Sequence, residues 1–400
     1  MTHSLNVIDN IQEVKILLAN LIDAGIDRID AIIYITPDEV DSNHAENSQD
    51  IIFAQALSYG VILHITQALL GVEDKLSINN LFIITKDAIA VDEDEITNPF
   101  QAPLWGLGKV IAQEVSMFSC NLLDISSQDQ KLQNELAKNA MHIALEVITQ
   151  DAEGKVAIRD NKRLVARLVT DEALNKAKDK QLSLNIINEN ATYLITGGLG
   201  ALGLVFAKHL ADIGAKHLVL VGRNAANKEV QRQIDSIADI GVEVKVVNID
   251  IADLEKTKDL IDAIDKKGKF ALHGIIHAAG VLDDAPIVKQ TFESYKKVMS
   301  PKILGTWNLH NATNDSNLDF FILFSSIASI IGNAGQVNYA AANEFMDSFA
   351  SYRKSKGLIA TSINWSGWAD VGMAANLDAN IFNRLSFKKS VPKKVHFRNL

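Results

Sequence analysis

Residues 192–364 alternate between short apolar runs and longer amphipathic stretches, and this alternation constrains the fold more than any other feature of the sequence. Continuous apolar runs spaced by helical stretches indicate parallel strands whose sheet is covered on both faces. We predict strands at 193–195, 217–221, 242–249, 274–277, 320–324 and 361–364, with helices near 201–213 and 226–240 and another that begins near Tyr339. Right-handed crossovers between such strands give a doubly wound fold.

The N-terminal half repeats this plan in a weaker form. We expect buried strands at 31–35, 81–84 and 164–169, and helices at 51–70, 103–114 and 133–148. No glycine-rich turn follows the first of these strands, so this half should have a structural role. The predicted fold class is α/β, with two Rossmann-like subdomains built on doubly wound parallel sheets, of which the N-terminal one is shortened and degenerate.

Composition excludes several classes of protein. The single cysteine, Cys120, cannot form an internal disulfide, and it indicates a reducing compartment such as the cytoplasm. The net charge of -10 argues against a nucleic-acid partner. The sequence predicts no membrane association, because we find no apolar run of the roughly 18–20 residues needed to span a bilayer, and the first residues do not form a signal peptide. The histidines show no ligand spacing with cysteines or acids, so we expect no metal.

A glycine-rich turn follows the strand predicted at 193–195. Gly198, Gly200 and Gly203 form the pattern GxGxxG and open the next helix. The first glycine permits a tight turn, the second lets the backbone approach a pyrophosphate, and the third allows the helix to pack close to the strand. The helix N-terminus brings partial positive charge to the phosphates. In this context the motif predicts a dinucleotide site, with a purely structural turn as the alternative.

The end of the next strand indicates which nicotinamide cofactor is used. An NAD site would place an acid there for the ribose 2′-hydroxyl, whereas this strand ends with Val221, Gly222, Arg223 and Asn224. Arg223 can pair with a 2′-phosphate, so NADPH is favoured. Asp250, at the end of the third strand, either accepts a hydrogen bond from the adenine amino group or caps its own loop.

Three polar residues form a candidate catalytic group at the end of the strand predicted at 320–324. Ser326 follows that strand, and Tyr339 lies 13 residues later on the next helix, with Asn343 on the same helix face. This layout resembles that of short-chain dehydrogenases/reductases. Ordinary members of that superfamily carry a lysine where this chain has Asn343, so the lysine must come from elsewhere. Lys302, 24 residues before Ser326, is the candidate.

Residues 192–375 resemble the ketoreductase domain of modular type I polyketide synthases. The matching stretches are TYLITGGLGALG, LVLVGR, GIIHAAGVLDD, SPKILGTWNLH, FFILFSSIASIIGNAGQVNYAAANEFMD and INWSGWADVGMA. Residues 81–110 resemble the end of that family's structural subdomain. The exchanged lysine and asparagine, with serine and tyrosine at the family's spacing, make the resemblance specific.

The resemblance implies an enzyme that reduces the 3-keto group of a polyketide bound to an acyl carrier protein, with NADPH as the hydride source. Tyr339 would donate a proton as general acid, and Ser326 would donate a hydrogen bond to the same oxygen. Lys302 would lower the pKa of Tyr339, and Asn343 would help to hold a proton-relay water. The implied partners are the carrier protein and the neighbouring domains of a megasynthase. The implied cofactor-binding residues are Gly197, Gly198, Gly200, Leu202, Gly203, Arg223, Asp250, Ala278, Ala279 and Gly280.

The resemblance also implies the stereochemistry of the product. Leu282, Asp283 and Asp284 resemble the motif of B-type ketoreductases, which give a D-configured 3-hydroxyl, and Asn338 before the tyrosine agrees. The residues assigned to the substrate and to stereocontrol are Leu282, Asp283, Asp284, Asn338 and Met373. Ile331 stands where A-type enzymes carry tryptophan, and Ala341 where B2-type enzymes carry proline, so the chain is B1-like. Ala334 departs from the proline of many B-type enzymes.

Polar residues 171–190 predict a linker. The expected division is a structural, non-binding subdomain over 1–188 and a catalytic NADPH-binding subdomain over 189–400, with an atypical tail at 378–400. The last twenty residues contain six basic groups and no acid, which fits either a solvated end or a docking patch for an acidic partner. Two alternatives to the active enzyme remain: a catalytically silent structural module of a megasynthase, and a stand-alone reductase of small ketones.

Overall fold

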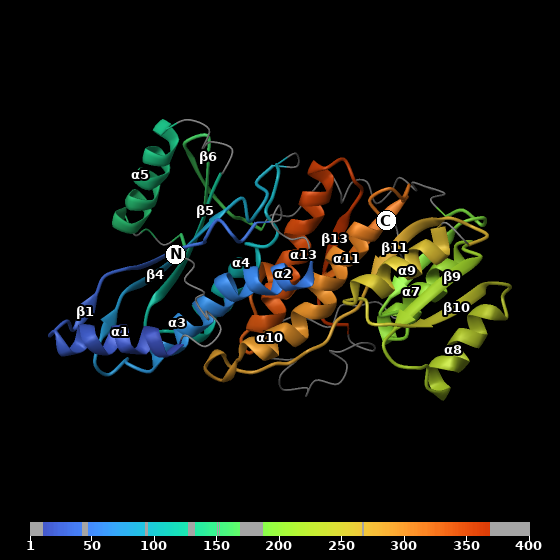
Figure 1. Ribbon diagram of the computed structural model, residues 1–400, viewed down its shortest axis with the longest axis horizontal. Helices are drawn as coiled ribbons and strands as arrows, with labels where there is room; N and C mark the ends of the chain where they lie inside the picture. Colours follow the sequence, from blue (N-terminus) through green and yellow to red (C-terminus); the bar gives the residue numbers. More distant parts are fainter. Residues whose placement is uncertain are drawn as a thin grey trace. The chain divides into compact units, whose positions relative to one another are not determined.

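The computed structural model describes residues 11–41, 47–92, 95–126, 133–149, 151, 153–168, 187–265 and 268–368 (Figure 1). Most of the predicted linker, Met373 and the atypical tail lie outside these residues. The contacts of the chain divide it into two compact units. Unit 1 combines Met1–Ala166, Gly280–Thr306 and Ser325–Asn364, and unit 2 combines Arg167–Ala279, Trp307–Phe324 and Trp365–Leu400. The subdomain boundary expected at residue 188 stays a prediction.

Six strands form the larger sheet in the order β10-β9-β8-β11-β12-β13. Their bounds are β8 Thr192–Thr196, β9 His217–Gly222, β10 Glu243–Asn248, β11 Leu272–His277, β12 Phe320–Ser326 and β13 Thr361–Trp365. The pairs β10–β9, β9–β8, β8–β11 and β11–β12 are parallel. The first strand in the sequence therefore lies beside the fourth, which is the order reversal of a doubly wound sheet. The predicted α/β fold class is confirmed.

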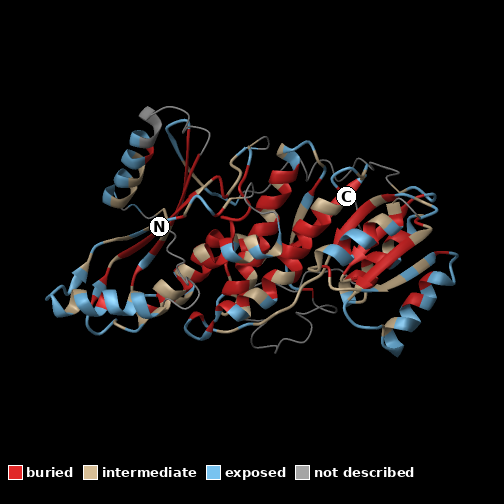
Figure 2. Ribbon diagram, viewed as in Figure 1, coloured by how far each residue is buried: buried red, intermediate tan, exposed pale blue. Residues whose placement is uncertain are grey.

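Seven α-helices accompany these strands in the described chain. They are α7 Ala201–Asp212, α8 Lys228–Ala238, α9 Leu254–Asp265, α10 Phe292–Met299, α11 Gly305–Ala312, α12 Ile327–Ile331 and α13 Val337–Ser355. The sequence analysis found α7, α8 and α13 but passed over the helices between β10 and β12. Figure 2 shows the contrast between α8, which buries only Ile234 and Ile237 among its eleven residues, and α13, which is buried over most of its length. A 3₁₀ turn, η5 (Ile287–Lys289), and a π-helix, η6 (Ser300–Leu304), complete this region.

The N-terminal sheet follows chain order, β2-β4-β5-β6-β7. Its strands are β2 Ile32–Ile35, β4 Asn80–Lys86, β5 Ser119–Ile125, β6 Lys155–Arg159 and β7 Lys162–Val165. The first four run parallel, while β7 turns back antiparallel to β6 through Asp160 and Asn161, both at positive φ. Two positive-φ residues between antiparallel strands define a tight two-residue hairpin. The sheet is thus the shortened relative of the larger one, and the sequence analysis missed β5 and β6.

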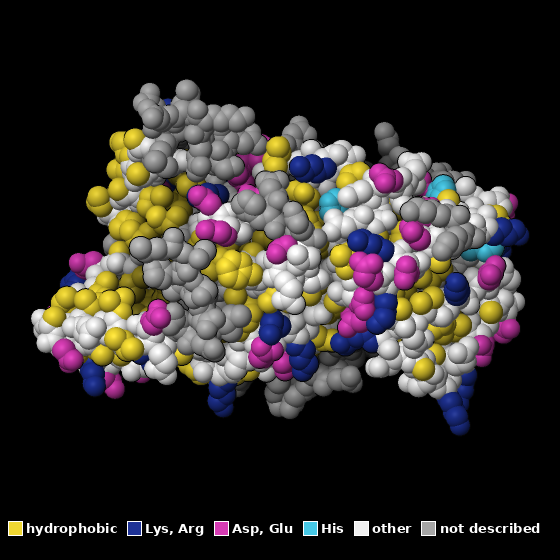
Figure 3. Space-filling view, viewed as in Figure 1, with side chains coloured by type: hydrophobic (Ala, Val, Ile, Leu, Met, Phe, Trp, Pro, Cys, Tyr) yellow, Lys and Arg dark blue, Asp and Glu magenta, His cyan; other side chains and the backbone are white. Residues whose placement is uncertain are grey.

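The helices of this half are α1 Ile11–Asp23, α2 Ser48–Gln55, α3 Val61–Leu70, α4 Pro103–Glu114 and α5 Gln133–Thr149, and a π-helix, η3 (Ala56–Gly60), joins α2 to α3. A small parallel pair, β1 Arg28–Ile29 with β3 Ser77–Ile78, forms a separate sheet. Side chains of α5 pack on a core made by β4, β5 and β6. Hydrophobic side chains are also exposed on α1 and α5, where Figure 3 shows them on the surface.

The stretch Ser48–Leu70 is one helical segment that, by length and composition alone, could cross a membrane. The sequence analysis overlooked it because polar residues such as Gln55, His64 and Gln67 interrupt the apolar run. In its most apolar 18-residue window, 61% is buried inside the protein, as in the core helix of a folded domain.

Helices α4 and α13 pack with their backbones in contact. A Cβ atom on Gly106 would lie 2.5 Å from the carbonyl carbon and oxygen of Ala340, so only glycine permits this approach. Gly106 and its neighbours in α4 are buried, as is Ala340. The close approach brings the polar side chains of α4 within reach of the segments that flank α13.

We expect Gly106→Ala to destabilise the protein. Alanine is favoured over glycine within a helix by about 1 kcal/mol, but the clash with the Ala340 backbone forces the helices apart at a cost of about 3 kcal/mol, the upper end of the usual range for overpacking. Urea denaturation should therefore show a lower free energy of unfolding for the variant. Gly154→Ala is the matched control, since its Cβ would meet no atom closer than 3.5 Å. A Gly106→Ala variant as stable as the wild type would contradict the observed packing.

Candidate active site

The structure brings Ser326, Tyr339, Asn343 and Lys302 together within unit 1. Ser326 ends β12 and caps α12, its hydroxyl accepting a hydrogen bond from the amide of Ala328 at 3.2 Å. Tyr339 lies in the first turn of α13 and Asn343 one turn later, where its side chain donates to the carbonyl oxygen of Tyr339 at 2.8 Å.

Lys302 lies in the π-helix η6, and its Nζ is 5.3 Å from the centre of the Tyr339 ring. A π-turn inserts an extra residue into a helix and is often found at functional sites. The side chain is almost fully buried, at 3% exposure. Lys302 thus reaches the face of the Tyr339 ring from outside α13.

The pKa of Tyr339 is raised by burial. Hydrogen bonds with Asn343 and Ser326 lower this pKa in part, and the negative charge of Asp284 raises it. The predicted lowering of this pKa by Lys302 stays a prediction. The phenol stays protonated at neutral pH, which is the state that a proton donor requires.

Burial lowers the pKa of Lys302 from 10.5 to about 7, and the carboxylate of Asp347 raises it in part. A lysine with a pKa near 7 changes its charge across the physiological range. Its ability to stabilise a nearby phenolate is therefore present below pH 7 and fades above it.

Asn343 has a buried side-chain oxygen with no hydrogen-bond partner among the residues that the structure describes. A buried amide oxygen without a protein partner is costly, and a bound water is the usual way to satisfy it. This orphaned acceptor beside Tyr339 is compatible with the predicted role of Asn343 in holding a water, which stays a prediction.

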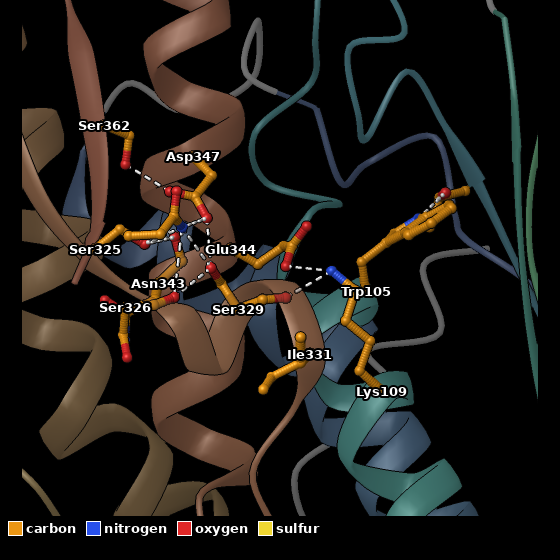
Figure 4. Close-up of polar contacts among 12 residues, drawn as sticks. Trp105, Lys109, Ser325, Ser326, Ser329, Ile331, Asn343, Glu344, Asp347 and Ser362 are labelled. Carbon is orange, nitrogen blue, oxygen red and sulfur yellow. Dashed lines mark hydrogen bonds and ion pairs between the residues drawn. The ribbon is translucent and has the colours of Figure 1, made fainter. Parts of the chain in front are cut away.

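The carboxylate of Asp347 on α13 binds a group of polar residues near Ser326 (Figure 4). It accepts hydrogen bonds from Ser329 and Ser362, both at 2.5 Å, and from Asn364 at 2.7 Å. Asn364 also donates to the hydroxyl of Ser325, which precedes Ser326, at 3.2 Å. The pKa of Asp347 is raised by burial, and these hydrogen bonds lower it in part. The network holds the end of β12 against β13 and α13.

Helix α4 supports the segment after Ser326. Lys109 donates to Glu344 of α13 at 2.7 Å and to the carbonyl oxygen of Ser329 at 2.6 Å (Figure 4). Gln113, one turn along α4, donates to the carbonyl oxygen of Ile331 at 2.6 Å. Burial raises the pKa of Glu344 to about 7 although Lys109 lowers it. The N-terminal half of the chain therefore supplies side chains that bind α12, the short helix after the candidate catalytic serine.

The glycine-rich turn lies in unit 2 between β8 and α7. Gly197 adopts a positive φ of 65°, and a Cβ there would lie 2.7 Å from the carbonyl oxygen of Ala278. A Cβ on Gly203 would lie 2.3 Å from the carbonyl oxygen of Gly197. Gly200 caps α7 without a side chain, and the first-turn amides after it, including that of Leu202, have no intrahelical acceptor. Backbone packed this closely at a helix N-terminus suits a dinucleotide pyrophosphate, so the residues present fit a nicotinamide dinucleotide.

The other predicted cofactor residues follow the ends of β9, β10 and β11. The hydroxyl of Thr196 and Nδ1 of His277 lie 2.6 Å apart and join the ends of β8 and β11, after which Gly197 and Ala278 follow. Ala278 and Ala279 are partly buried, and Arg223, after β9, is exposed. The carboxylate of Asp250 accepts from the amide of Ala252 at 3.0 Å, so it caps its own loop. Gly280 belongs to unit 1, where a Cβ would lie 3.1 Å from Cε of Lys302.

Four of the predicted stereocontrol residues lie in unit 1, with Leu282, Asp283 and Asp284 in one loop and Asn338 in the first turn of α13. Asn338 donates to the carbonyl oxygen of Asp283 at 2.7 Å, and Gln336 donates to the carboxylate of Asp284 at 2.8 Å. Asp283 also lies 3.4 Å from Lys297. Leu282 is partly buried beside them.

Several residues around the site were missed in the sequence. Asp347, Glu344 and Lys109 are charged groups on otherwise apolar, buried helix faces. A charge on an apolar helix face is the signal that could have identified them, because such groups are rarely buried without a partner.

The comparisons with known proteins agree with this architecture. Residues 191–370 match the family model described as the KR domain, and residues 26–168 match the Rossmann fold domain of the polyketide synthase extender module SpnB. The chain is 33% identical over 303 residues to polyketide synthase GfsA of Streptomyces halstedii, which covers 75% of this chain and 4% of that protein. It is 36% identical over 290 residues to one of the phenolphthiocerol/phthiocerol polyketide synthase proteins of Mycobacterium tuberculosis, covering 69% of this chain and 15% of that protein.

Solved structures give the same result. An A-type ketoreductase structure from a modular polyketide synthase has a TM-score of 0.76 at 28% identity and covers 94% of this chain and 74% of its own. The first ketoreductase of the tylosin synthase has a TM-score of 0.73 at 28% identity with the same coverage. Fold and site together define a Rossmann-type oxidoreductase domain. The chain belongs to the ketoreductase domain family of modular polyketide synthases.

The lowered pKa of Lys302 predicts a pH dependence. Lys302 is charged below pH 7 and neutral above it, so the rate constant for keto reduction should fall as the pH rises through about 7. Each further pH unit should lower the rate about tenfold if the charge is required. Turnover measured from pH 6 to 9 tests this.

Lys302→Arg is the control, because its guanidinium keeps its charge over that range. The variant should be slower but lose the descending limb near pH 7. A limb that stays in place in the variant would assign the titration to another group.

Proposed function

We propose that this chain catalyses the NADPH-dependent reduction of the 3-keto group of an acyl thioester carried by an acyl carrier protein. The observation that carries the proposal is the convergence of the Tyr339 and Ser326 hydroxyls with the ammonium of Lys302 in unit 1. Two hydroxyl donors beside a cation form a site for an oxygen on which negative charge develops.

Each of these residues has a separate task in the proposed reaction. The phenol of Tyr339 gives its proton to the forming alkoxide, and the hydroxyl of Ser326 donates a hydrogen bond to the same oxygen. Charged Lys302, over the Tyr339 ring, stabilises the phenolate left behind. The unpartnered oxygen of Asn343 holds a water through which the phenolate regains a proton.

NADPH, when bound, supplies the hydride for the keto carbon. Gly197, Gly198, Gly200 and Gly203 support its pyrophosphate at the start of α7. Arg223 is exposed after β9, where it pairs with the 2′-phosphate and selects NADPH over NADH.

We assign a D-configured, B1-like product. This assignment rests on Leu282, Asp283 and Asp284 and on the hydrogen bond from Asn338 to the backbone of Asp283, which joins the motif to the first turn of α13. Met373, for which we propose a substrate contact, lies outside the described residues.

The proposed partners are the carrier protein and neighbouring domains of a megasynthase, in a reducing compartment such as the cytoplasm. The curated relatives are much longer than this chain, which covers 4% of one and 15% of another. Exposed apolar residues on α5, Met141, Leu145 and Ile148, offer a surface for such a domain.

Replacement of Tyr339 by phenylalanine tests the function. Loss of the proton donor should lower the turnover of a small 3-ketoacyl thioester at least about a hundredfold, while NADPH binding stays unchanged. NADPH oxidation is followed by absorbance, and the product is identified by chiral chromatography. Tyr352→Phe, on the same helix, is the control and should keep its activity. A folded wild type that binds NADPH but does not turn over would support the silent structural module instead.

Replacement of Arg223 by alanine tests the cofactor. Loss of the pairing with the 2′-phosphate should raise the KM for NADPH about tenfold or more and leave the KM for NADH unchanged. Arg232→Ala on α8 removes an exposed arginine that pairs with Glu229 at 2.8 Å and serves as the control. Equal effects on both cofactors would place Arg223 away from the 2′-phosphate.

A further inference from the structure

Two loops of unit 1 lie beside Tyr339 and are joined to each other. One is residues 282–287, the last of which begins η5, and the other is residues 332–336, which lead directly into α13 at Val337. The amide of Ala285 donates to the carbonyl oxygen of Gly335 at 2.9 Å. The side chains of Asn338 and Gln336 add hydrogen bonds to the first loop at 2.7 and 2.8 Å.

One carboxylate from the N-terminal half binds both loops. Glu114 Oε2 accepts from the amide of Ile287 at 2.7 Å, and its Oε1 accepts from the amide of Gly335 at 2.7 Å. Each oxygen therefore holds a different loop. Hydrogen bonds from amides to a carboxylate are stronger than those between neutral groups, and two of them fix both the distance and the direction.

The C-terminal end of α4 is an unfavourable position for an acidic residue such as Glu114. Glu114 is the last residue of α4, where the helix dipole disfavours a negative charge. The neighbouring side chains of α4 also reach forward, since Gln113 binds Ile331 and Lys109 binds Ser329. The side chains at the C-terminal end of α4 thus support the segments around the candidate catalytic residues.

Both loops lie close to the phenol of Tyr339. The second loop leads into the turn that carries Tyr339, and Asp284 on the first loop lies close enough for its charge to act on that phenol. A ketone that accepts a proton from Tyr339 would lie next to these loops, so their positions would bear on which face of the ketone is presented.

We propose that Glu114 is a positioning and specificity-determining residue, which fixes the stereochemical outcome of the reduction by clamping the amides of Ile287 and Gly335. The residue touches no reacting atom. The inference rests on the proposed keto reduction and assigns its fidelity to a residue outside the tetrad.

Glu114→Gln tests the clamp. Glutamine has nearly the same shape, but its NH₂ group cannot accept a hydrogen bond, so one loop is released. With a racemic 2-methyl-3-ketoacyl thioester, we expect the KM to rise about tenfold, kcat to change less than about threefold, and a single stereoisomer to become a mixture. NADPH affinity and thermal unfolding are measured in parallel. Glu229→Gln, an exposed glutamate on α8, is the matched control.

The outcomes separate the two proposals. If the wild type reduces no keto thioester, the proposed function fails. If the wild type is active and folded Glu114→Gln keeps its KM and a single stereoisomer, the clamp is overturned. A uniform fall in kcat, with unchanged KM and stereochemistry, would also overturn it in favour of a merely structural role.

Hydrogen exchange provides a second test, and its wild-type measurement does not depend on the fold of any variant. In the wild type, the amides of Ile287 and Gly335 should exchange slowly, and in Glu114→Asp, whose shorter side chain cannot span both loops, at least one should exchange faster. Rapid exchange at both amides in the wild type would overturn the clamp.

Discussion

Helix α13 must be buried and polar at the same time, and the rest of unit 1 depends on this constraint. Its buried residues include Asn338, Asn343, Glu344, Ser348 and Arg353. Burial of each such group costs free energy unless the group forms a hydrogen bond, so the surrounding elements must supply hydrogen-bond partners. Ser329 and Asn364 donate hydrogen bonds to Asp347, and Lys109 donates one to Glu344. The carbonyl oxygen of Asp283 accepts one from Asn338. An orphaned oxygen lies at Asn343, beside the phenol that is to lose a proton.

Because of the same constraint, the N-terminal half also supplies side chains that bind segments around the candidate active site. The contact between Gly106 and Ala340 brings α4 close enough for three polar side chains near its C-terminal end to reach the segments around the tetrad. A helix that packed at the usual distance would leave these side chains short of their partners. The close packing of the α4 and α13 backbones is therefore what allows the polar side chains of α4 to form these hydrogen bonds.

The sequence was sufficient where a residue acts through its neighbours along the chain. The glycine-rich turn, Arg223 after β9 and the spacing from Ser326 to Asn343 are local patterns, and the structure has the expected elements around each of them. The apolar runs gave the strands of the larger sheet to within a few residues. By contrast, the sequence analysis missed α10 and α11, because it located elements from apolar runs and that region contains none.

Residues that act across long sequence distances could not be identified in this way. Glu114 binds amides 173 and 221 residues away, and no periodic pattern records such a contact. The π-turn that carries Lys302 depends on tertiary packing, because SPKIL has no special local signal. The pKa of Tyr339 likewise follows from burial, which the sequence alone did not provide.

The division of unit 1 into three separated segments has a consequence for its synthesis. Residues 1–166 are made first, but roughly 200 more residues must follow before the last segment, Ser325–Asn364, is available. At about 5–20 residues per second, α4 waits some 10–40 seconds on the ribosome before α13 can cover it. During that interval its apolar face is open to solvent and to other nascent chains. Helix α4 is therefore a candidate binding site for chaperones while the chain is being synthesised.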